Sequence, residues 1–386
     1  MRRPLIWVNL SIILSFFHSM AHAQAQPPGF RVEGRYLVDR CGQRVVLRGI
    51  NEMTTWSSRS GASLAEIAKT GANCVRIVAV VADKAADLDN WMNLSVKAGM
   101  IPMPELHDAT GLLNKLPSLF DYWLKPEIVA VLKKHESHLL LNIGNEVGDN
   151  NVTAVEWKTA YAAGIKRMRD AGIKATIVVD APGYGQKLSV IREAGLDLLA
   201  ADPEKNLLFS VHTYWPVMWG WTDQKVKDEL QSTVDKGIPF IIGEFGNEWE
   251  QNAAGAIPYK LILEECQRLG LGWLAWSWGP GNNPQTWLDM TTDGKFSSLR
   301  GWGLEVAQTL PTSIKNTSVR PASLGSGVCA AGIAKKPEIR SVTGRGNREM
   351  SGAGWIYRYN PAEDAGRDAR GRRKEPQAKD HSDPSR

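Results

Sequence analysis

Residues 239–246 read PFIIGEFG, an apolar run that ends on Glu244 between two glycines. Its first half predicts a strand buried on both faces, as in a parallel sheet. Residues 139–146 read LLLNIGNE and repeat this design, with Asn145 and Glu146 at the end. A single charged residue at a strand end is often one that simply reaches solvent. Two carboxylates at two strand ends instead form a pair that can carry out chemistry.

The rest of the chain alternates predicted strands with predicted helices. Strands are expected at 44–51, 74–79, 101–107, 139–146, 176–181, 207–214, 239–246 and 272–278. Helices are expected at 63–69, 85–98, 126–134, 154–169, 189–194, 223–236, 257–269 and near 298–308. Eight such units over about 280 residues predict an α/β fold, a (β/α)8 TIM barrel. A doubly wound sheet is the alternative, but no glycine-rich phosphate loop follows the first strand. Residues 34–38 and 44–48 flank a turn and predict an N-terminal β-hairpin.

The two ends of the chain differ from its body. Residues 1–23 combine two arginines, a short apolar run and Ala21-His22-Ala23, which predicts a secretory signal peptide and a secreted protein, extracellular or periplasmic. Residues 24–310 form the predicted catalytic domain, with a net charge of −4. Residues 311–386 hold 15 Lys/Arg and few long apolar side chains, so we expect a basic, disordered tail. Attachment to an acidic surface is the other reading of the tail. The overall charge of +5 therefore gives no indication of nucleic acid binding.

The four cysteines show no metal-binding spacing. Cys74 and Cys266 lie in apolar surroundings and are expected to be free core thiols. Cys41 and Cys329 are able to pair only if the tail folds back, and the sequence leaves that question open.

Polar residues gather where the predicted strands end, and barrel enzymes build their active sites at that end. They are Arg76, Glu105, His107, Asn145, Glu146, Asp180, His212, Tyr214, Glu244, Trp276 and Trp278. Tryptophans also follow strand ends and suit the apolar faces of sugar rings, although about half of them are expected only to pack loops. They are Trp56, Trp215, Trp219, Trp221, Trp249 and Trp287.

These residues lie in motifs that resemble family 5 glycoside hydrolases, the cellulase and β-mannanase family. The motifs are VVLRGIN at 45–51, NCVRI at 73–77, LHDATG at 106–111, NE at 145–146, HTY at 212–214, GEFG at 243–246 and WLAWSW at 273–278. The wording of LHDATG and LAWSW is most similar to bacterial endo-β-1,4-mannanases. The chain departs from the family at Val147-Gly148, where relatives have an aromatic residue, and in the loop 215–221. Both segments are expected to touch substrate.

The resemblance implies a retaining endo-β-1,4-glycanase, with mannan as the first expected substrate and cellulose or another β-glucan as the next. It implies Glu146 as acid/base and Glu244 as nucleophile, in line with the two carboxyl groups that glycoside cleavage requires. Arg76 and Tyr214 are expected to stabilise ionised Glu244, and Asn145 to bind a substrate hydroxyl. His107, His212, Trp56, Trp276 and Trp278 are expected to shape the site.

A metal site and a noncatalytic carbohydrate-binding barrel are the two alternatives. A metal site at His107, Asp108, His212 and Glu244 lacks the short ligand spacing of a zinc motif, so we expect no metal and no cofactor. A noncatalytic carbohydrate-binding barrel would be expected to have lost one carboxylate, and this chain keeps both. The expected partner is a polysaccharide, with no nucleic acid and no membrane span, and the expected state is a monomer.

Overall fold

The computed structural model describes residues 29–324 and Cys329. Eight parallel strands form its central sheet, in the spatial order β5-β4-β3-β10-β9-β8-β7-β6. Their bounds are β3 (Arg48–Glu52), β4 (Cys74–Ala79), β5 (Ile101–Leu106), β6 (Leu140–Asn142), β7 (Thr176–Asp180), β8 (Leu207–His212), β9 (Phe240–Glu244) and β10 (Gly272–Ala275). The two end strands approach each other where Asn145 N–H donates to the Leu106 carbonyl at 2.9 Å. The predicted TIM barrel is confirmed.

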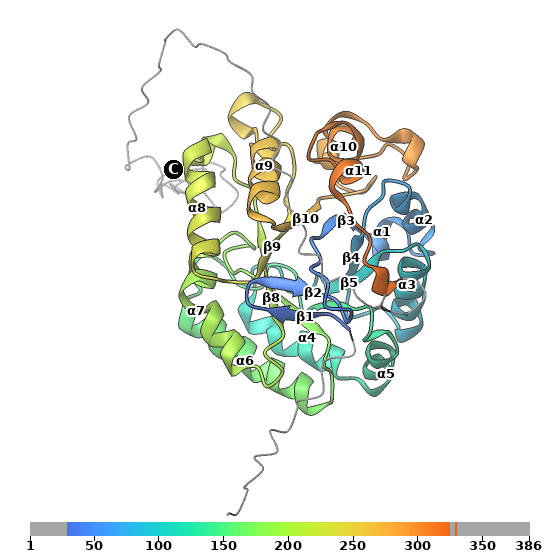
Figure 1. The fold of residues 1–386 in the computed structure, drawn as a ribbon, viewed down its shortest axis with the longest axis vertical. Coiled ribbons are helices and arrows are strands. Elements are labelled where there is room, and N and C mark those ends of the chain that lie inside the picture. Colours follow the sequence, from blue (N-terminus) through green and yellow to red (C-terminus); the bar gives the residue numbers. More distant parts are fainter. Residues whose placement is uncertain (1–28, 325–328, 330–386) are drawn as a thin grey trace, which may run out of the picture. The chain divides into compact units, whose positions relative to one another are not determined.

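Helices surround the strands (Figure 1). They are α1 (Thr54–Ser57), α2 (Ala62–Ala68), α3 (Ala85–Lys97), α4 (Leu116–Trp123), α5 (Pro126–His135), α6 (Ala154–Asp170), α7 (Leu188–Ala201), α8 (Asp223–Asp235), α9 (Tyr259–Leu269), α10 (Gly301–Leu304) and α11 (Ile314–Thr317). Helices α1, α4 and α11 were not predicted from the sequence, and the predicted helix at 189–194 covers less than half of α7. The apolar faces of the surrounding helices pack on the outside of the strands, so the main core lies between the layer of helices and the layer of strands.

The barrel interior is apolar at the end where the strands begin. Met103, Leu140, Val178 and Leu274 belong to one buried cluster there, together with Phe30 at the start of the described chain. The N-terminal hairpin, β1 (Arg31–Glu33) with β2 (Tyr36–Val38), lies at this end of the barrel (Figure 1). It therefore occurs earlier in the chain than expected. The predicted pairing of 34–38 with 44–48 is reduced to one bridge between Val38 and Arg44.

The packed chain extends beyond Leu310, the residue at which the sequence analysis ends the catalytic domain. Ile314 is fully buried, and Thr317 Oγ1 accepts a hydrogen bond of 3.0 Å from the buried Arg48. Cys329 is bonded to Cys41, and both Cys74 and Cys266 are buried free thiols, as expected. Further hydrogen bonds hold residues 311–324, although their composition is mostly polar: Asn73 Nδ2 donates to the Val319 carbonyl at 2.9 Å, and Arg320 donates to the Ala68 carbonyl at 2.7 Å. The predicted signal peptide and the tail from residue 330 lie outside the described residues.

Within residues 29–324, no helix has both the length and the apolar character needed to span a membrane.

Candidate active site

Both carboxylates of the predicted pair lie at the carboxyl end of the barrel. Glu244 is the last residue of β9, whereas Glu146 lies four residues beyond the end of β6. The backbone of Glu146 has a φ of +48°, a conformation that non-glycine residues seldom adopt. Asp180 Oδ2 accepts its N–H at 3.1 Å, and Gly111 N–H donates to its carbonyl at 2.8 Å. These two hydrogen bonds fix the unusual backbone conformation from which the Glu146 side chain projects.

Arg76 is the centre of the buried polar network. Its guanidinium group has no exposed surface and donates to Glu244 Oε1 at 2.7 Å and to Asp180 Oδ2 at 3.3 Å. Its other acceptors are amide oxygens, Asn142 Oδ1 at 2.8 Å, Asn51 Oδ1 at 3.1 Å and Asn145 Oδ1 at 2.8 Å. A buried charge is tolerated when it is paired and fully hydrogen-bonded. The network therefore holds Arg76 as a fixed cation beside Glu244.

Glu244 has two donors that favour its ionised form. Arg76 contacts Oε1, and Tyr214 Oη–H donates to Oε2 at 2.8 Å. Burial raises the pKa of Glu244 to about 7, and Arg76, His107 and the Tyr214 hydrogen bond keep it from rising further. Burial and the charges of both glutamates raise the pKa of Tyr214 well above its ordinary value, so its hydroxyl keeps the proton that it donates.

Glu146 lies in surroundings that favour its protonated form. Burial, followed by the charges of Glu244 and Asp180, raises its pKa well above the ordinary value. Its Oε1 is 2.7 Å from His212 Nδ1, and burial lowers the pKa of His212, so this neighbour is a neutral imidazole. Oxygens of Glu146 and Glu244 lie within 4.8 Å of each other. The two carboxyl groups thus face one another with different preferred protonation states.

Asn145 and His107 form the side of the site next to Arg76. The Asn145 amide donates to Thr110 Oγ1 at 2.9 Å, and its Nδ2 lies 3.3 Å from His107 Nε2. His107 Nδ1 is 2.8 Å from Glu105 Oε1. Burial disfavours the imidazolium form of His107, but the charge and hydrogen bond of Glu105 and the charge of Glu244 together outweigh it, so the pKa of His107 is raised. Every polar atom of this pair therefore has a defined partner.

The tryptophans divide into two groups. Trp276 stacks on His107, with ring centroids 5.7 Å apart, and Trp56 meets the same imidazole edge-on and is 58% exposed. Trp278 is fully buried, and its Nε1–H donates to the Gly294 carbonyl at 2.8 Å. Because it is buried, its ring face is not open to a sugar, and a role for Trp278 in shaping the site stays a prediction. Strand β10 ends at Ala275, so the two-residue alternation used to align it with Trp276 no longer applies.

The loops after β8 and β9 carry a second aromatic group. Trp219 and Trp249 lie with ring centroids 4.8 Å apart, and Trp249 also contacts Tyr214. Trp215 is buried and stacks on Trp221 at 4.0 Å. Trp219 and Trp249 are partly exposed, next to Tyr214, which donates to Glu244. The Trp215–Trp221 pair instead packs its own loop.

Several members of the polar network were given no role from the sequence. Glu105 and Asp180 were named only as polar residues at strand ends. Asn51, Thr110 and Asn142 were not named among those residues. Asn51 and Asn142 stand inside apolar strands, and a polar residue in such a place usually has a buried partner. That signal was present in the sequence, although it does not name the partner.

The structure does not gather the residues of the alternative metal site. Asp108 Oδ2 accepts the Val81 N–H at 2.9 Å instead of joining the histidines. Glu146, His212 and Glu244 do place one ligand atom each within 4.8 Å of one another. A neutral imidazole and two carboxylates suit a divalent metal, but the guanidinium of Arg76 against Glu244 opposes a further cation there.

Comparisons with known proteins agree with this geometry. The family model described as cellulase (glycosyl hydrolase family 5) matches residues 38–282. The chain belongs to glycosyl hydrolase family 5. It is 34% identical to a mannan endo-1,4-beta-mannosidase of Salipaludibacillus agaradhaerens over 286 residues, 71% of this chain and 89% of that protein. A mannan endo-1,4-beta-mannosidase of Streptomyces lividans is 31% identical, with 87% and 88% covered.

Among solved structures, this family 5 chain is similar to a β-mannanase from Thermomonospora fusca. The TM-score is 0.70 at 31% identity, with 77% of this chain and 99% of that chain covered. One expected departure from the family does not reach the site. Val147 is fully buried and forms a bridge with Thr110, so its side chain does not face a substrate.

Proposed function

We propose that this glycoside hydrolase is a secreted retaining endo-β-1,4-mannanase. The observation that carries the retaining mechanism is the close approach of two carboxyl groups, with oxygens of Glu146 and Glu244 within 4.8 Å. Retaining enzymes hold their carboxyl groups about 5–5.5 Å apart, and inverting enzymes leave about 6.5–9.5 Å for a water molecule. Glu146 and Glu244 are therefore too close together for the separation that inverting enzymes use, and their approach supports retention.

In the first step, we assign the proton donor to Glu146. Its raised pKa keeps a proton that it delivers to the glycosidic oxygen as the bond to C1 breaks. Glu244, ionised beside Arg76 and Tyr214, attacks C1 from the opposite face and forms a glycosyl ester. The positive charge that develops on the sugar is balanced by the Glu244 carboxylate until the ester forms.

In the second step, the roles reverse at Glu146. Formation of the ester removes the negative charge of Glu244, which is the second cause of the raised pKa of Glu146. Glu146 is then a carboxylate that accepts a proton from water as that water attacks C1, and the ester bond from C1 to Glu244 breaks and releases Glu244 as a carboxylate. Two displacements at one carbon restore the starting configuration. The neutral His212 at 2.7 Å keeps the Glu146 carboxyl oriented in both states.

Substrate binding is assigned to the rest of the site. Of the two contacts made by the Asn145 amide, the one to His107 at 3.3 Å is longer than the one to Thr110 at 2.9 Å, so we assign its hydrogen to exchange His107 for a sugar hydroxyl when substrate binds. Trp276 and the exposed Trp56 offer ring faces and edges for sugar stacking. Mannan is preferred over glucan because the two relatives compared above are mannan endo-1,4-beta-mannosidases.

The test is a screen of the purified protein on galactomannan, carboxymethylcellulose, mixed-linkage glucan and xylan, with reducing ends as the readout. We expect release from galactomannan above all, with strong loss in Glu146→Gln and Glu244→Gln. Faster release from carboxymethylcellulose would make the enzyme a cellulase. Glycan binding without hydrolysis, unchanged in both variants, would establish a noncatalytic barrel. Secretion is supported by residues 1–23, and N-terminal sequencing of exported protein is expected to begin near Gln24.

A further inference from the structure

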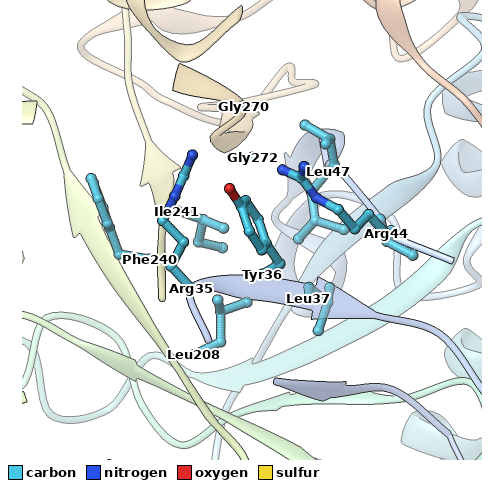
Figure 2. Close-up of a pocket in the computed structure, with 12 residues that line it drawn as sticks. Arg35, Tyr36, Leu37, Arg44, Leu47, Leu208, Phe240, Ile241, Gly270 and Gly272 are labelled. Atoms are coloured by element: carbon cyan, nitrogen blue, oxygen red, sulfur yellow. The ribbon is translucent and has the colours of Figure 1, made fainter. Parts of the chain in front are cut away.

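A small pocket lies at the end of the barrel opposite the carboxylate pair. The hairpin strand β2 and the starts of β9 and β10 form its walls, and its lining includes Arg35, Tyr36, Arg44, Gly270 and Gly272. Figure 2 shows the Tyr36 ring in the middle of the pocket, with its hydroxyl toward Gly270 and Gly272. Nothing in the proposed hydrolytic mechanism uses these residues.

Two cations flank the tyrosine. The guanidinium carbon of Arg44 is 3.4 Å from the centroid of the Tyr36 ring, and that of Arg35 is 4.4 Å from it. Figure 2 shows the two guanidinium groups on either side of the ring. The ring face attracts each cation through its quadrupole, but a neutral tyrosine supplies no net negative charge.

No carboxylate of the described residues balances the Arg44 charge. The charged or ionisable groups that act on Arg44 are Tyr36 and Arg35, and burial together with Arg35 lowers the pKa of Arg44. Arg44 Nε is buried and has no hydrogen-bond partner among the described residues. In contrast, the buried Arg76 and Arg169 each contact a carboxylate, at 2.7 Å and 2.8 Å.

The end of helix α9 supplies part of the missing charge. Arg35 Nη1 donates to the Leu269 carbonyl in its last turn at 3.0 Å. A helix C-terminus carries roughly half a negative charge, which is less than two guanidinium groups require. The pocket therefore retains a positive charge, two sets of N–H donors and the Tyr36 hydroxyl.

We propose that this pocket binds a small monovalent anion of the size of chloride, held by Arg44, Arg35 and the Tyr36 hydroxyl. The pocket volume of about 20 Å³ has room for one water-sized group. A halide ion fits that volume, and a sulfate or phosphate with four oxygens exceeds it. The anion would tie the N-terminal hairpin to the end of α9 and so contribute to stability.

Two measurements on the full-length protein test the proposal. In crystals soaked in bromide, an anomalous peak is expected beside the Tyr36 hydroxyl, at the edge of the ring and within reach of the Arg44 and Arg35 guanidinium groups. In solution, the melting temperature is expected to rise saturably with sodium chloride when ionic strength is kept constant with sodium gluconate, because a ligand of the folded state stabilises it. Sodium sulfate at equal ionic strength is expected to give no such saturable rise.

Arg44→Gln is expected to weaken the chloride response about tenfold, as is typical for loss of one charge-assisted hydrogen bond. Tyr36→Phe keeps the ring and should weaken the chloride response by a smaller factor. This variant tests the proposal if Arg44→Gln fails to fold. The matched control is Arg167→Gln, since Arg167 contacts Asp121 at the surface, and it should keep the wild-type response. A wild type without a saturable chloride effect, an unchanged response in Tyr36→Phe and Arg44→Gln, or saturation by sulfate alone would overturn the proposal.

Discussion

Tyr214→Phe tests whether a hydrogen bond keeps the Glu244 carboxylate ionised. The substitution removes only the hydroxyl, whose Oη donates to Glu244 Oε2 at 2.8 Å. A hydrogen bond to a charged group contributes about 1.5–3 kcal/mol. Arg76 still contacts the other oxygen of Glu244, so the lower end of that range applies. We expect a loss of roughly tenfold in kcat/KM, because about 1.4 kcal/mol corresponds to a factor of ten.

The same substitution is expected to shift the pH dependence of kcat/KM in a defined direction. The Tyr214 hydroxyl stabilises the ionised form of Glu244, so its removal raises the pKa of Glu244 by about one unit. Because the first displacement needs Glu244 ionised, the acidic limb of the kcat/KM profile is expected to move to higher pH, with the basic limb much less affected. The assay is the initial rate of manno-oligosaccharide hydrolysis across the acidic and neutral range.

The control is Tyr122→Phe, which removes a buried hydroxyl that donates to the Asp83 carbonyl at 3.0 Å, away from the carboxylate pair. It is expected to leave both limbs in place. An acidic limb that stays fixed in Tyr214→Phe, or one that moves equally in Tyr122→Phe, would refute the assigned role of the hydrogen bond.

Two further predictions concern Asp180 and the segment after Leu310. His212 lies between two carboxylates: its Nε2 is 3.4 Å from Asp180 Oδ2, and its Nδ1 is 2.7 Å from Glu146 Oε1. The two carboxylates are therefore roughly 8 Å apart or less. At that distance their repulsion is about 2 kcal/mol at an effective dielectric of 20. Asp180→Asn is therefore expected to lower the pKa of Glu146 and to move the basic limb of kcat/KM to lower pH by at least one unit; an unmoved limb would contradict this. A chain ending at Leu310 is expected to melt at lower temperature than one ending at Ala330. It loses the fully buried Ile314, worth about 2–5 kcal/mol, and also the disulfide between Cys41 and Cys329, worth about 2–4 kcal/mol. Equal melting temperatures would show that residues after Leu310 are dispensable.

The sequence was sufficient to predict the barrel and the carboxylate pair, because both depend on local pattern. Apolar runs alternated with amphipathic helices, and Glu244 stood at the end of its strand as expected. Glu146 shows the limit of this reasoning. Its strand stops at Asn142, and the side chain reaches the site through a positive φ that only its tertiary hydrogen bonds stabilise.

Other features depended on contacts between distant segments. The expected shared face of Trp276 and Trp278 does not follow, because the strand geometry ends before them, at Ala275. The segment after Leu310 has a mostly polar composition, and its packing depends on Ile314 and on the acceptor that Thr317 offers to Arg48. The network around Arg76 joins β3, β4, β6, β7 and β9, so no single segment of sequence contains it.

The most direct test of the central claim, that Glu146 is the acid/base and Glu244 the nucleophile, is chemical rescue with azide. Glu146→Ala still forms the glycosyl ester from an activated aryl β-mannoside, since that leaving group needs no proton. Azide then displaces Glu244 and is expected to give the β-mannosyl azide after two inversions. Glu244→Ala lacks the first displacement, so azide is expected to attack directly and give the α-mannosyl azide. The anomeric configuration is read by NMR. The α-azide from Glu146→Ala and the β-azide from Glu244→Ala would contradict the assignment of the two roles.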